Sequence, residues 1–517
     1  MTVFDILLKN RGITTAAQKK EFLRPVKPEK IPLAQTGIKA TALQPALRRV
    51  QQALKTKELV YIYGDYDADG ICSTAILWEA LHGLGARVWP YLPDRTDPVR
   101  GLSQDGIDSF KEKPNLIITV DNGISAARGC EYAKKLGIEV IITDHHIPKE
   151  KLPPAKAIIH TTQLAGAGVA WFFSRELTQS PAGLDLAAVG TIADMVPLVG
   201  VNRSLAKFGL DRLKKSRRPG IAALLKEITP QQISFSLAPR LNAMGRMADS
   251  LDALRLLCTN NKAKVRLLAE KLNRVNDERQ TQTLAMWEHS RQRVDKQSKL
   301  IFLADKSYHE GLVGLVAGRL AEAFNRPAFV GAIGPRQVKF SCRSMPGFSA
   351  IAAIRALGNL VLECGGHPLA AGFTAATDKI TKIKTELLKQ TAKLTKADFA
   401  PKSSYECRLD LQAITPEFYT RLQQLEPFGF GNPQPLFLAK QVTVNRFYPV
   451  GQDNKHLKLT LQGSTLKSFN AIAFGKGSLA AKLIPGQLAD VVYSVEQNSW
   501  NNKKSLELKI KEMYNLN

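Results

Sequence analysis

Short apolar segments that stop at a glycine or an aspartate limit most strongly how this chain can fold. Three of them, residues 59–62, 116–120 and 138–143, have the length and composition of buried strands. Weaker strand candidates lie at 87–92 and 156–159, and helix-like segments lie at 73–81 and about 125–136. Strands that are apolar almost throughout and alternate with helices indicate a parallel sheet covered on both faces.

Acidic side chains and two histidines come directly after these strands or after an Ala-rich, helix-like segment. In chain order they are Asp65, Asp67, Asp69, Asp121, Asp144, His145, His146 and Asp194. Parallel sheets bind ligands beyond the carboxyl ends of their strands. Any single aspartate here could instead cap the N-terminus of a helix. Four such clusters, three of them at equivalent strand ends, are hard to explain as independent caps, so we predict one shared site.

Residues 63–70, Tyr-Gly-Asp-Tyr-Asp-Ala-Asp-Gly, carry three carboxylates at alternate positions. Carboxylates this close repel one another unless a cation lies among them. Taken alone, the stretch could also be an acidic surface turn or a single calcium loop. With the other acids and an imidazole it suits Mn²⁺ or Mg²⁺, and so many carboxylates can hold two ions about 3.5–4 Å apart. Such a pair can activate water and neutralise a phosphate, so the sequence predicts a phosphoesterase.

The composition indicates where such an enzyme works and on what. A chain of 517 residues forms two to four domains, and its formal net charge of +26 favours a polyanionic partner. Nucleic acid is the first candidate, an anionic membrane surface the second, and a merely basic protein the alternative. Six scattered cysteines without a Cys-x-x-Cys pair argue against a zinc site or a disulfide framework. With no signal peptide and no apolar run near 18 residues, we expect a soluble, cytoplasmic protein that does not enter a membrane.

Four motifs, in this order, resemble the DHH phosphoesterase superfamily and, within it, the RecJ family of single-strand-specific 5′→3′ DNA exonucleases. They are Asp-x-Asp-x-Asp-Gly, Val-Asp-Asn-Gly, Asp-His-His and Ala-Asp-x-Val-Pro. The resemblance runs from about residue 55 into the C-terminal region. It implies metal ligands at Asp67, Asp69, Asp121, His145 and Asp194, with Asp121 and Asp194 bridging two ions. It also implies catalytic roles for Asp65, which would support or bind a metal, and for His146 near the scissile phosphate. For His146 a structural hydrogen bond is the alternative.

Two further stretches match family motifs that contact substrate. Residues 239–246, between Pro and Gly, suit a shaped loop, and the resemblance implies that Arg240, Asn242 and Arg246 face the active-site cleft. Residues 341–344, Ser-Cys-Arg-Ser, match a family loop, and 365–373 form a glycine-rich turn with a Gly-Gly-His signature. Glycine permits close approach of backbone to ligand. The resemblance makes these residues substrate binders, with Arg343 and His367 also catalytic: His309, Arg343, Ser344, Gly366 and His367.

We expect an α/β protein with two α/β lobes joined by a long helix, and a C-terminal β-barrel of the OB-fold. The predicted parts are a helical lead-in (1–54), a DHH domain (55–200), a helical region (201–298), a DHH-associated substrate domain (299–396) and the barrel (405–517). Residues 262–297 lack Gly and Pro and read as one helix, about 54 Å long. Barrels of this kind bind single strands with stacking aromatics. The candidates are Phe447, Tyr448, Phe469, Phe474 and Trp500, although such aromatic residues are more often part of the core than a stacking platform.

Several features depart from the family or have two explanations. Residues 100–102 read Arg-Gly-Leu where relatives commonly have Tyr-Gly-Leu, and His160-Thr161-Thr162 stands where Asn-Pro is usual, before a short loop. The basic run 214–218 is either a solvated face or a phosphate contact. Residues 428–433, Phe-Gly-Phe-Gly-Asn-Pro, match a family loop that leads into the barrel.

Three functions remain open at this point. The first is an exonuclease for single-stranded DNA with two Mn²⁺ or Mg²⁺ ions, acting in DNA repair and recombination. The second is a superfamily enzyme for short oligoribonucleotides, a cyclic dinucleotide or pyrophosphate, which the length, charge and barrel disfavour. The third is a DNA-binding scaffold with a decayed site, although none of the expected acids is missing. The resemblance also implies single-strand-binding protein and a RecQ-type helicase as partners.

Overall fold

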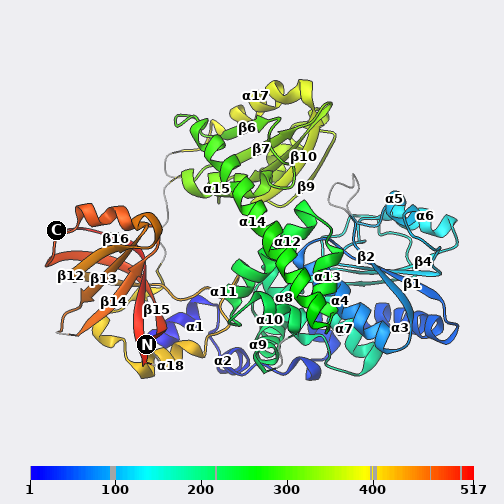
Figure 1. Cartoon of the computed structure of the whole chain (residues 1–517), viewed down its shortest axis with the longest axis horizontal. Coiled ribbons are helices and arrows are strands. Elements are labelled where there is room, and N and C mark those ends of the chain that lie inside the picture. Colours follow the sequence, from blue (N-terminus) through cyan, green and yellow to red (C-terminus); the bar gives the residue numbers. More distant parts are fainter. Residues whose placement is uncertain are drawn as a thin grey trace.

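The computed structural model describes residues 2–93, 101–215, 218–395, 399, 405–465, 467–500 and 503–516. Three β-sheets, separate in space, organise the chain from its blue N-terminal part to its red C-terminal part (Figure 1). This architecture confirms the predicted two α/β lobes and barrel. Arg100, where the sequence departs from the family, lies outside the described residues.

The first sheet is all-parallel, with strand order β2-β1-β3-β4-β5. Its strands are β1 (Leu59–Tyr63), β2 (Arg87–Tyr91), β3 (Leu116–Val120), β4 (Glu139–Asp144) and β5 (Ala157–His160). Along β1, Val60 and Ile62 enter one hydrophobic core, whereas Tyr61 and Tyr63 enter another. Both faces of the sheet are therefore buried, as the apolar segments predict.

Helices cover the two faces of this sheet unequally (Figure 1). The larger core contains α3 (Ala40–Lys55), α4 (Ala68–Gly83), α7 (Gly166–Thr178) and α8 (Leu184–Ala193), and the smaller contains α5 (Gln104–Asp108) and α6 (Ala127–Lys135). Helix α4 begins at Ala68, earlier than predicted, because the Asp67 side chain caps it. The chain leaves β1 for β2 on one side and returns to β3 on the other. In doubly wound sheets this reversal opens a crevice at the strand ends, where ligands bind.

A helical region follows and carries the chain to the second lobe. Its elements are α9 (Gly200–Lys215), α10 (Pro219–Leu224), α11 (Pro230–Gln232), η3 (Ile233–Leu237), α12 (Ala238–Met247), α13 (Leu251–Cys258) and α14 (Lys262–Gln292). The predicted loop at 239–246 is wrong, because these residues form α12. Pro239 sits in its first turn, where no N–H donor is needed, and Leu241 and Met244 are buried. Within the described ranges, every helix is too short or too polar to reach across a lipid bilayer.

The long helix α14 joins the two lobes, as predicted, but it has 31 residues and is about 46 Å long. The chain turns after Gln292 because Arg326 holds the next segment outside the helix. Its guanidinium donates hydrogen bonds to the carbonyl oxygens of Asp295, Lys296 and Ser298. In the basic run 214–218, Lys214 and Lys215 are exposed, whereas Arg218 is bound by Glu79 and Asp185. Ser216 and Arg217 lie outside the described residues.

The second lobe has a mixed sheet of order β6-β7-β8-β10-β9. Its elements are β6 (Ile301–Asp305), α15 (Val313–Phe324), β7 (Ala328–Ile333), β8 (Gln337–Arg343), α16 (Ala350–Arg355), η4 (Gly358–Leu360), β9 (Glu363–Gly366), β10 (Ala370–Ala376), η5 (Thr377–Lys379) and α17 (Ile380–Thr391). Two predicted loops are shorter than expected. Residues 341–343 end β8 because Arg343 pairs with Ala370, and only 367–369 form the glycine-rich turn, because Gly365 and Gly366 pair with β10.

The C-terminal sheet closes into a barrel of five strands, because β12 pairs with both β13 and β15 and β14 pairs with β16. The elements are β11 (Cys407–Arg408), η7 (Leu411–Ala413), α18 (Pro416–Gln423), β12 (Phe437–Val450), η8 (Gln452–Asn454), β13 (His456–Gln462), β14 (Ser468–Ala473), η9 (Gly477–Lys482), β15 (Gln487–Trp500) and β16 (Lys503–Tyr514). Among the candidate aromatics, Tyr448 and Phe474 are exposed, Phe469 is buried and Phe447 packs on the core. The side chain of Trp500 lies outside the described part.

The N-terminal elements are α1 (Val3–Asn10), α2 (Ala16–Leu23), η1 (Pro28–Lys30) and η2 (Leu33–Thr36). Phe4, Leu7, Leu8 and Phe22 from α1 and α2 belong to the core of the barrel. In Figure 1 these blue helices lie beside the barrel at the opposite end of the sequence. The beginning of the chain therefore anchors its last domain to the first lobe.

Candidate metal centre

The turn between β1 and α4 is held by hydrogen bonds at both ends. Asp67 Oδ1 accepts from the backbone N–H groups of Asp69 (2.9 Å) and Gly70 (3.1 Å), so Asp67 is the N-cap of α4. A Cβ on Gly70 would lie 2.5 Å from the Asp65 carbonyl oxygen, so only glycine fits. From α12, Asn242 Oδ1 accepts from the Ala68 N–H at 2.6 Å. Asn242, predicted to face the cleft, thus also holds the turn that carries the three aspartates.

Asp69 is buried at the N-terminus of α7. Its carboxylate oxygens accept from the N–H groups of Gly166 (2.7 Å) and Ala167 (3.0 Å), where the helix dipole favours negative charge. Glycine leaves room for the acids at two positions. A Cβ on Gly190 would lie 2.4 Å from Asp69 Oδ1, and one on Gly166 would lie 2.5 Å from Asp121 Oδ1. Helices α7 and α8 therefore approach the strand ends closely enough to surround both carboxylates.

Asp121 follows β3 in a left-handed conformation, with φ of 60°. Such a conformation costs a non-glycine residue about 1 kcal/mol or more, and it persists where neighbours enforce it. The Thr119 hydroxyl donates to the Asn122 carbonyl oxygen at 2.7 Å, and Asn122 Nδ2 donates to the carbonyl oxygens of Tyr63 (3.1 Å) and Val120 (2.9 Å). These bonds tie the ends of β1 and β3 together and fix the turn at Asp121.

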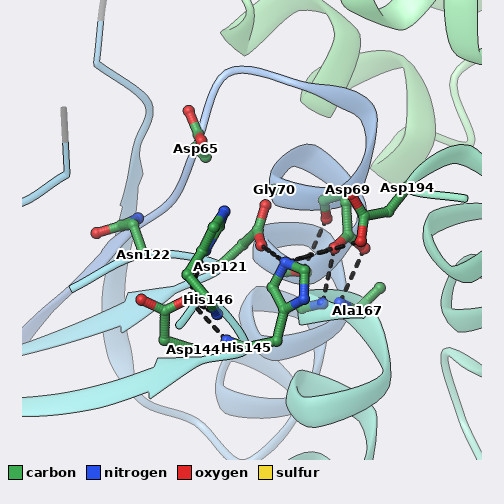
Figure 2. Close-up of polar contacts among 12 residues, drawn as sticks. Asp65, Asp69, Gly70, Asp121, Asn122, Asp144, His145, His146, Ala167 and Asp194 are labelled. Carbon is green, nitrogen blue, oxygen red and sulfur yellow. Dashed lines mark hydrogen bonds and ion pairs between the residues drawn. The ribbon is translucent and has the colours of Figure 1, made fainter. Parts of the chain in front are cut away.

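In the Asp-His-His motif, the buried Asp144 orients the two histidines. Asp144 Oδ1 accepts from the N–H groups of His145 (2.7 Å) and His146 (3.1 Å) and lies 2.8 Å from His146 Nδ1, while Oδ2 accepts from the Ile124 N–H. The His145 ring lies among the other acids (Figure 2). Its Nε2 is 3.1 Å from Asp121 Oδ1 and 3.8 Å from Asp194 Oδ2. His146 is half-exposed, and its ring centroid is 4.5 Å from that of His145.

These side chains form three overlapping groups whose ligand atoms lie within 4.8 Å of one another. The groups are Asp121, His145 and His146; Asp69, His145 and Asp194; and Asp65, Asp67 and Asp121. Asp121 and His145 each belong to two groups. The structure thus brings together all five residues expected to bind metal, with Asp65 and His146 beside them. These residues come from the ends of three strands and from the end of α8.

Burial and the neighbouring carboxylates raise the pKa values of the acids in this cluster, because little positive charge lies among them. Desolvation, followed by the charge of Asp67, raises the pKa of Asp69 to about 7. Desolvation and the charge of Asp69 raise the pKa of Asp194 to about 8 and that of Asp121 well above its usual value. Desolvation lowers the pKa of His145 to about 4, so its ring is neutral and offers a lone pair. The hydrogen bond to Asp144 raises the pKa of His146 to about 9.

The donor set fits a hard divalent cation. Asp121 Oδ1 is buried and accepts no hydrogen bond, although His145 Nε2 is 3.1 Å away. We read this proximity as two ligand atoms facing one position and not as an ion pair, because the imidazole is neutral. Carboxylate oxygens with one imidazole suit Mn²⁺ or Mg²⁺. The three groups overlap only at Asp121 and His145, so together they offer enough ligand atoms for more than one ion.

The predicted substrate residues lie on α12 and in the second lobe. Arg240 donates to Asn273 Oδ1 on α14, and Arg246 Nη1 donates to the Gly311 carbonyl oxygen at 2.7 Å, across the two lobes. His309 Nδ1 accepts from the Gly311 N–H. The remaining residues surround the end of β8 and the β9–β10 turn: Arg343, Ser344, Gly366 and His367. The Ser344 N–H donates to the Leu369 carbonyl oxygen and the His367 N–H to that of Ala370, so these residues form one group at the end of β8.

Several residues that shape the centre have no individual role in the sequence prediction. Asp144 is predicted only as a member of the shared site, and Asn122, Gly166 and Gly190 are not predicted; these four residues form the walls and hydrogen bonds of the centre. The sequence signal for Asp144 is its place at the carboxyl end of β4. Gly166 and Gly190 stand in helix-forming segments, where glycine is unfavourable, and such a glycine signals close packing.

Comparisons with known proteins agree with this geometry. The DHH family N-terminal domain matches residues 59–191, the DHHA1 domain matches 297–393, and the RecJ OB domain matches 405–512. The single-stranded-DNA-specific exonuclease RecJ of Bacillus subtilis is 35% identical over 532 residues, covering 98% of this chain and 67% of that protein.

Two crystal structures of RecJ from Thermus thermophilus are similar to the whole chain. The complex with Mn²⁺ has a TM-score of 0.85 at 32% identity and covers 99% of this chain and 76% of that one. The complex with Mg²⁺ has a TM-score of 0.79 at 31% identity, with 98% and 74% covered. Since the similarity spans all three sheets as well as the metal-type cluster, this chain belongs to the RecJ family of single-stranded-DNA-specific exonucleases.

Proposed function

We propose that this protein is a metal-dependent exonuclease that hydrolyses single-stranded DNA from the 5′ end to 5′-mononucleotides, in DNA repair and recombination. The observation that carries the proposal is the convergence of acids and an imidazole from distant parts of the chain on one partly buried site. The family relatives named above support DNA as the substrate. The closed barrel and the net charge of +26 are consistent with a polyanionic single strand.

Five residues would hold Mn²⁺ or Mg²⁺: Asp67, Asp69, Asp121, His145 and Asp194. Two such ions would lower the pKa of water and neutralise charge on the phosphate that is attacked. Asp67 and Asp69 are already oriented by backbone N–H groups, so little reorganisation is needed when a cation enters. Asp65 lies at the edge of this set, where it could support a ligand or complete the coordination.

His146 is suited to contact the scissile phosphate. Asp144 binds its Nδ1, and the ring is half-exposed, so Nε2 remains available to a substrate oxygen. We expect His146 to stabilise charge on that oxygen, because its raised pKa keeps the ring protonated and a charged donor makes a stronger hydrogen bond to an anionic oxygen. The bond to Asp144 would keep the ring in a fixed orientation while it does so.

The second lobe would bind the strand end. Arg343 and His367 would grip a phosphate, with Ser344, Gly366 and His309 beside them, and Arg246 would link this group to α12. Gly366 has φ of 131°, and a Cβ there would lie 2.5 Å from the Ala370 carbonyl oxygen, so the turn depends on glycine. Substrate held between two lobes would be a single strand, since a duplex is wider. Single-strand-binding protein and a RecQ-type helicase are the partners we propose for this activity.

A digestion assay tests the proposal. With Mn²⁺, we expect 5′-labelled single strands to release labelled mononucleotides at once, and strands blocked at the 5′ end to resist. Asp121→Asn should abolish release, whereas Asp378→Asn, an exposed carboxylate of η5, should not affect it. Release of internal fragments, or faster digestion of 3′-accessible strands, would contradict the proposed polarity. A protein that ignores long strands and cleaves dinucleotides would belong to the second functional class.

A further inference from the structure

An exposed apolar patch lies beside the metal centre, where the segment after Asp194 contacts the segment that leads into the barrel. It consists of Met195, Val199 and Phe430, whose exposed fractions are 63%, 44% and 56%. Met195 directly follows Asp194 and has φ of 59°, a left-handed conformation that is costly for a methionine. Exposed apolar groups gathered at one place, next to a reactive centre, indicate a binding surface.

Two segments far apart in the sequence form this patch side by side. The Leu198 N–H donates to the Phe430 carbonyl oxygen at 2.8 Å. A Cβ on Gly431 would lie 2.8 Å from Pro197 Cβ, and one on Gly429 would lie 2.7 Å from Leu198 Cδ1. The glycines therefore let the segment 429–431 press directly on the segment that follows the metal-type residue Asp194.

Hydrogen bonds of Asn432, Arg11 and Arg203 hold the segment that carries Phe430 and form a joint between the first lobe and the barrel. Asn432 is fully buried, and its Nδ2 donates to the carbonyl oxygens of Leu425 (2.8 Å) and Pro427 (2.9 Å). Arg11 Nε donates to Asn432 Oδ1 at 2.7 Å, and the buried Arg203 donates to Leu425 and Glu426. Exposure of the three apolar side chains is thus built into a well-ordered region, and it does not reflect a loose loop.

We propose that Met195, Val199 and Phe430 bind the unstacked bases of single-stranded DNA between the metal centre and the barrel. This inference rests on the proposed function. The patch begins one residue after Asp194, and the segment that carries Phe430 leads into β12 of the barrel at Phe437, so the patch lies on the connection between the metal centre and the barrel. Apolar side chains contact the face of any base, whatever the sequence. A duplex hides those faces, so the patch favours single strands.

Binding measured without cleavage tests this role. We compare the wild type with the double variant Met195→Ser, Phe430→Ser in EDTA, using a 3′-labelled oligothymidylate that spans from the metal centre to the barrel. We expect the Kd to rise about tenfold, because one base contact of this kind changes affinity on the order of 5- to 150-fold. On a strand of equal length whose nucleotides near the 5′ end are abasic, the two proteins should bind equally.

Leu267→Ser, an equally exposed apolar residue on α14, is the matched control and should leave both Kd values unchanged. Equal Kd values for the wild type and the double variant on the intact strand would overturn the proposal. So would an equal loss on both strands, because the contact would then not be with bases. If the double variant unfolds at lower temperature than the wild type, Val199→Ser alone must show the same strand-dependent loss. Because binding is read in EDTA, failure here is distinguishable from absence of nuclease activity.

Discussion

The Cβ that Gly166 lacks would lie 2.5 Å from Oδ1 of Asp121. Gly166 opens α7, and its N–H also binds Asp69, so one residue both supports one carboxylate and leaves space for another. Gly190 on α8 likewise leaves space for Asp69, because a Cβ there would lie 2.4 Å from Asp69 Oδ1. The packing of helices against the strand ends therefore determines the size of the cation site.

The first prediction concerns these glycines. Gly190→Ala should displace the Asp69 carboxylate and lower kcat by about tenfold to a hundredfold, as altered support of a metal site usually does. Mn²⁺ affinity, measured by calorimetry on the metal-free protein, should fall with it. The control is Gly83→Ala at the end of α4, where a Cβ meets nothing within 4 Å. If Gly190→Ala leaves the Mn²⁺ affinity at the wild-type value, the Asp69 carboxylate does not need the space that this glycine leaves.

The second prediction isolates Asp144, which no metal-type group contains. Asp144→Asn keeps the shape of the side chain but removes the charge that faces His146 Nδ1. We expect kcat on single strands to fall about 10- to 100-fold with a smaller change in Mn²⁺ affinity. Steady-state rates and a Mn²⁺ titration measure the two effects separately. Asp105→Asn, an exposed acid of α5, serves as control; equal rates for both variants would rule out the orienting role.

The third prediction is a pH dependence of the metal-free protein. Burial raises the pKa of Asp69 to about 7 and of Asp194 to about 8, above the value of an unfolded aspartate. Between about pH 4 and about pH 8 the folded state therefore binds more protons than the unfolded state, and stability falls as pH rises. Below about pH 4 both states are protonated and the penalty vanishes.

Asp194→Asn removes part of that penalty. At pH 8 the metal-free variant should unfold about 2 °C or more above the wild type, and near pH 4 the two should unfold together. Saturating Mn²⁺ should reverse the order at pH 8, because the wild type then gains binding energy that the variant lacks. Thermal unfolding scans with EDTA or Mn²⁺ measure both. Parallel wild-type and variant curves across this pH range would show that Asp194 does not carry the penalty.

How far the sequence predicts this site depends on what determines each residue's position. Asp65, Asp121 and His145 follow parallel strands, and parallel strands end at one edge of a sheet, so their convergence could be predicted. The carboxylate of Asp144 could not be separated from the ligands, because its hydrogen bonds depend on the direction of one side chain at the end of β4. The role of Gly190 could not be predicted either, because it contacts Asp69 only when α8 packs against the strand ends.

The secondary structure, like the site, could be predicted only where local sequence determines it. The buried strands of the first sheet were predictable from composition, whereas α12 was not, because Pro and Gly in residues 239–246 indicate a loop locally. Burial of Leu241 and Met244 against neighbouring helices overrides that local preference. The end of α14 likewise depends on Arg326, which comes from a distant part of the chain.

The last prediction concerns the joint between the first lobe and the barrel. Arg203 is buried on α9, with its guanidinium 3.8 Å from the Phe22 ring centroid. It donates to the carbonyl oxygens of Phe22, Gln424, Leu425 and Glu426. Desolvation lowers the pKa of Arg203 to about 10, so it remains charged at neutral pH and relies on these carbonyl groups.

Arg203→Met should cost at least about 3 kcal/mol, because each buried carbonyl group left without a partner costs about 1–3 kcal/mol. Arg203→Lys keeps the charge but offers fewer donors in a different geometry, so an intermediate loss is expected. Arg212→Met, on the exposed side of the same helix, is the matched control. Denaturant unfolding measures all three. The barrel and the segment after Asp194 share this joint. Arg203→Met should therefore also weaken the binding of long strands more than the cleavage of short ones. Equal losses of binding and cleavage would mean that the joint contributes to stability alone.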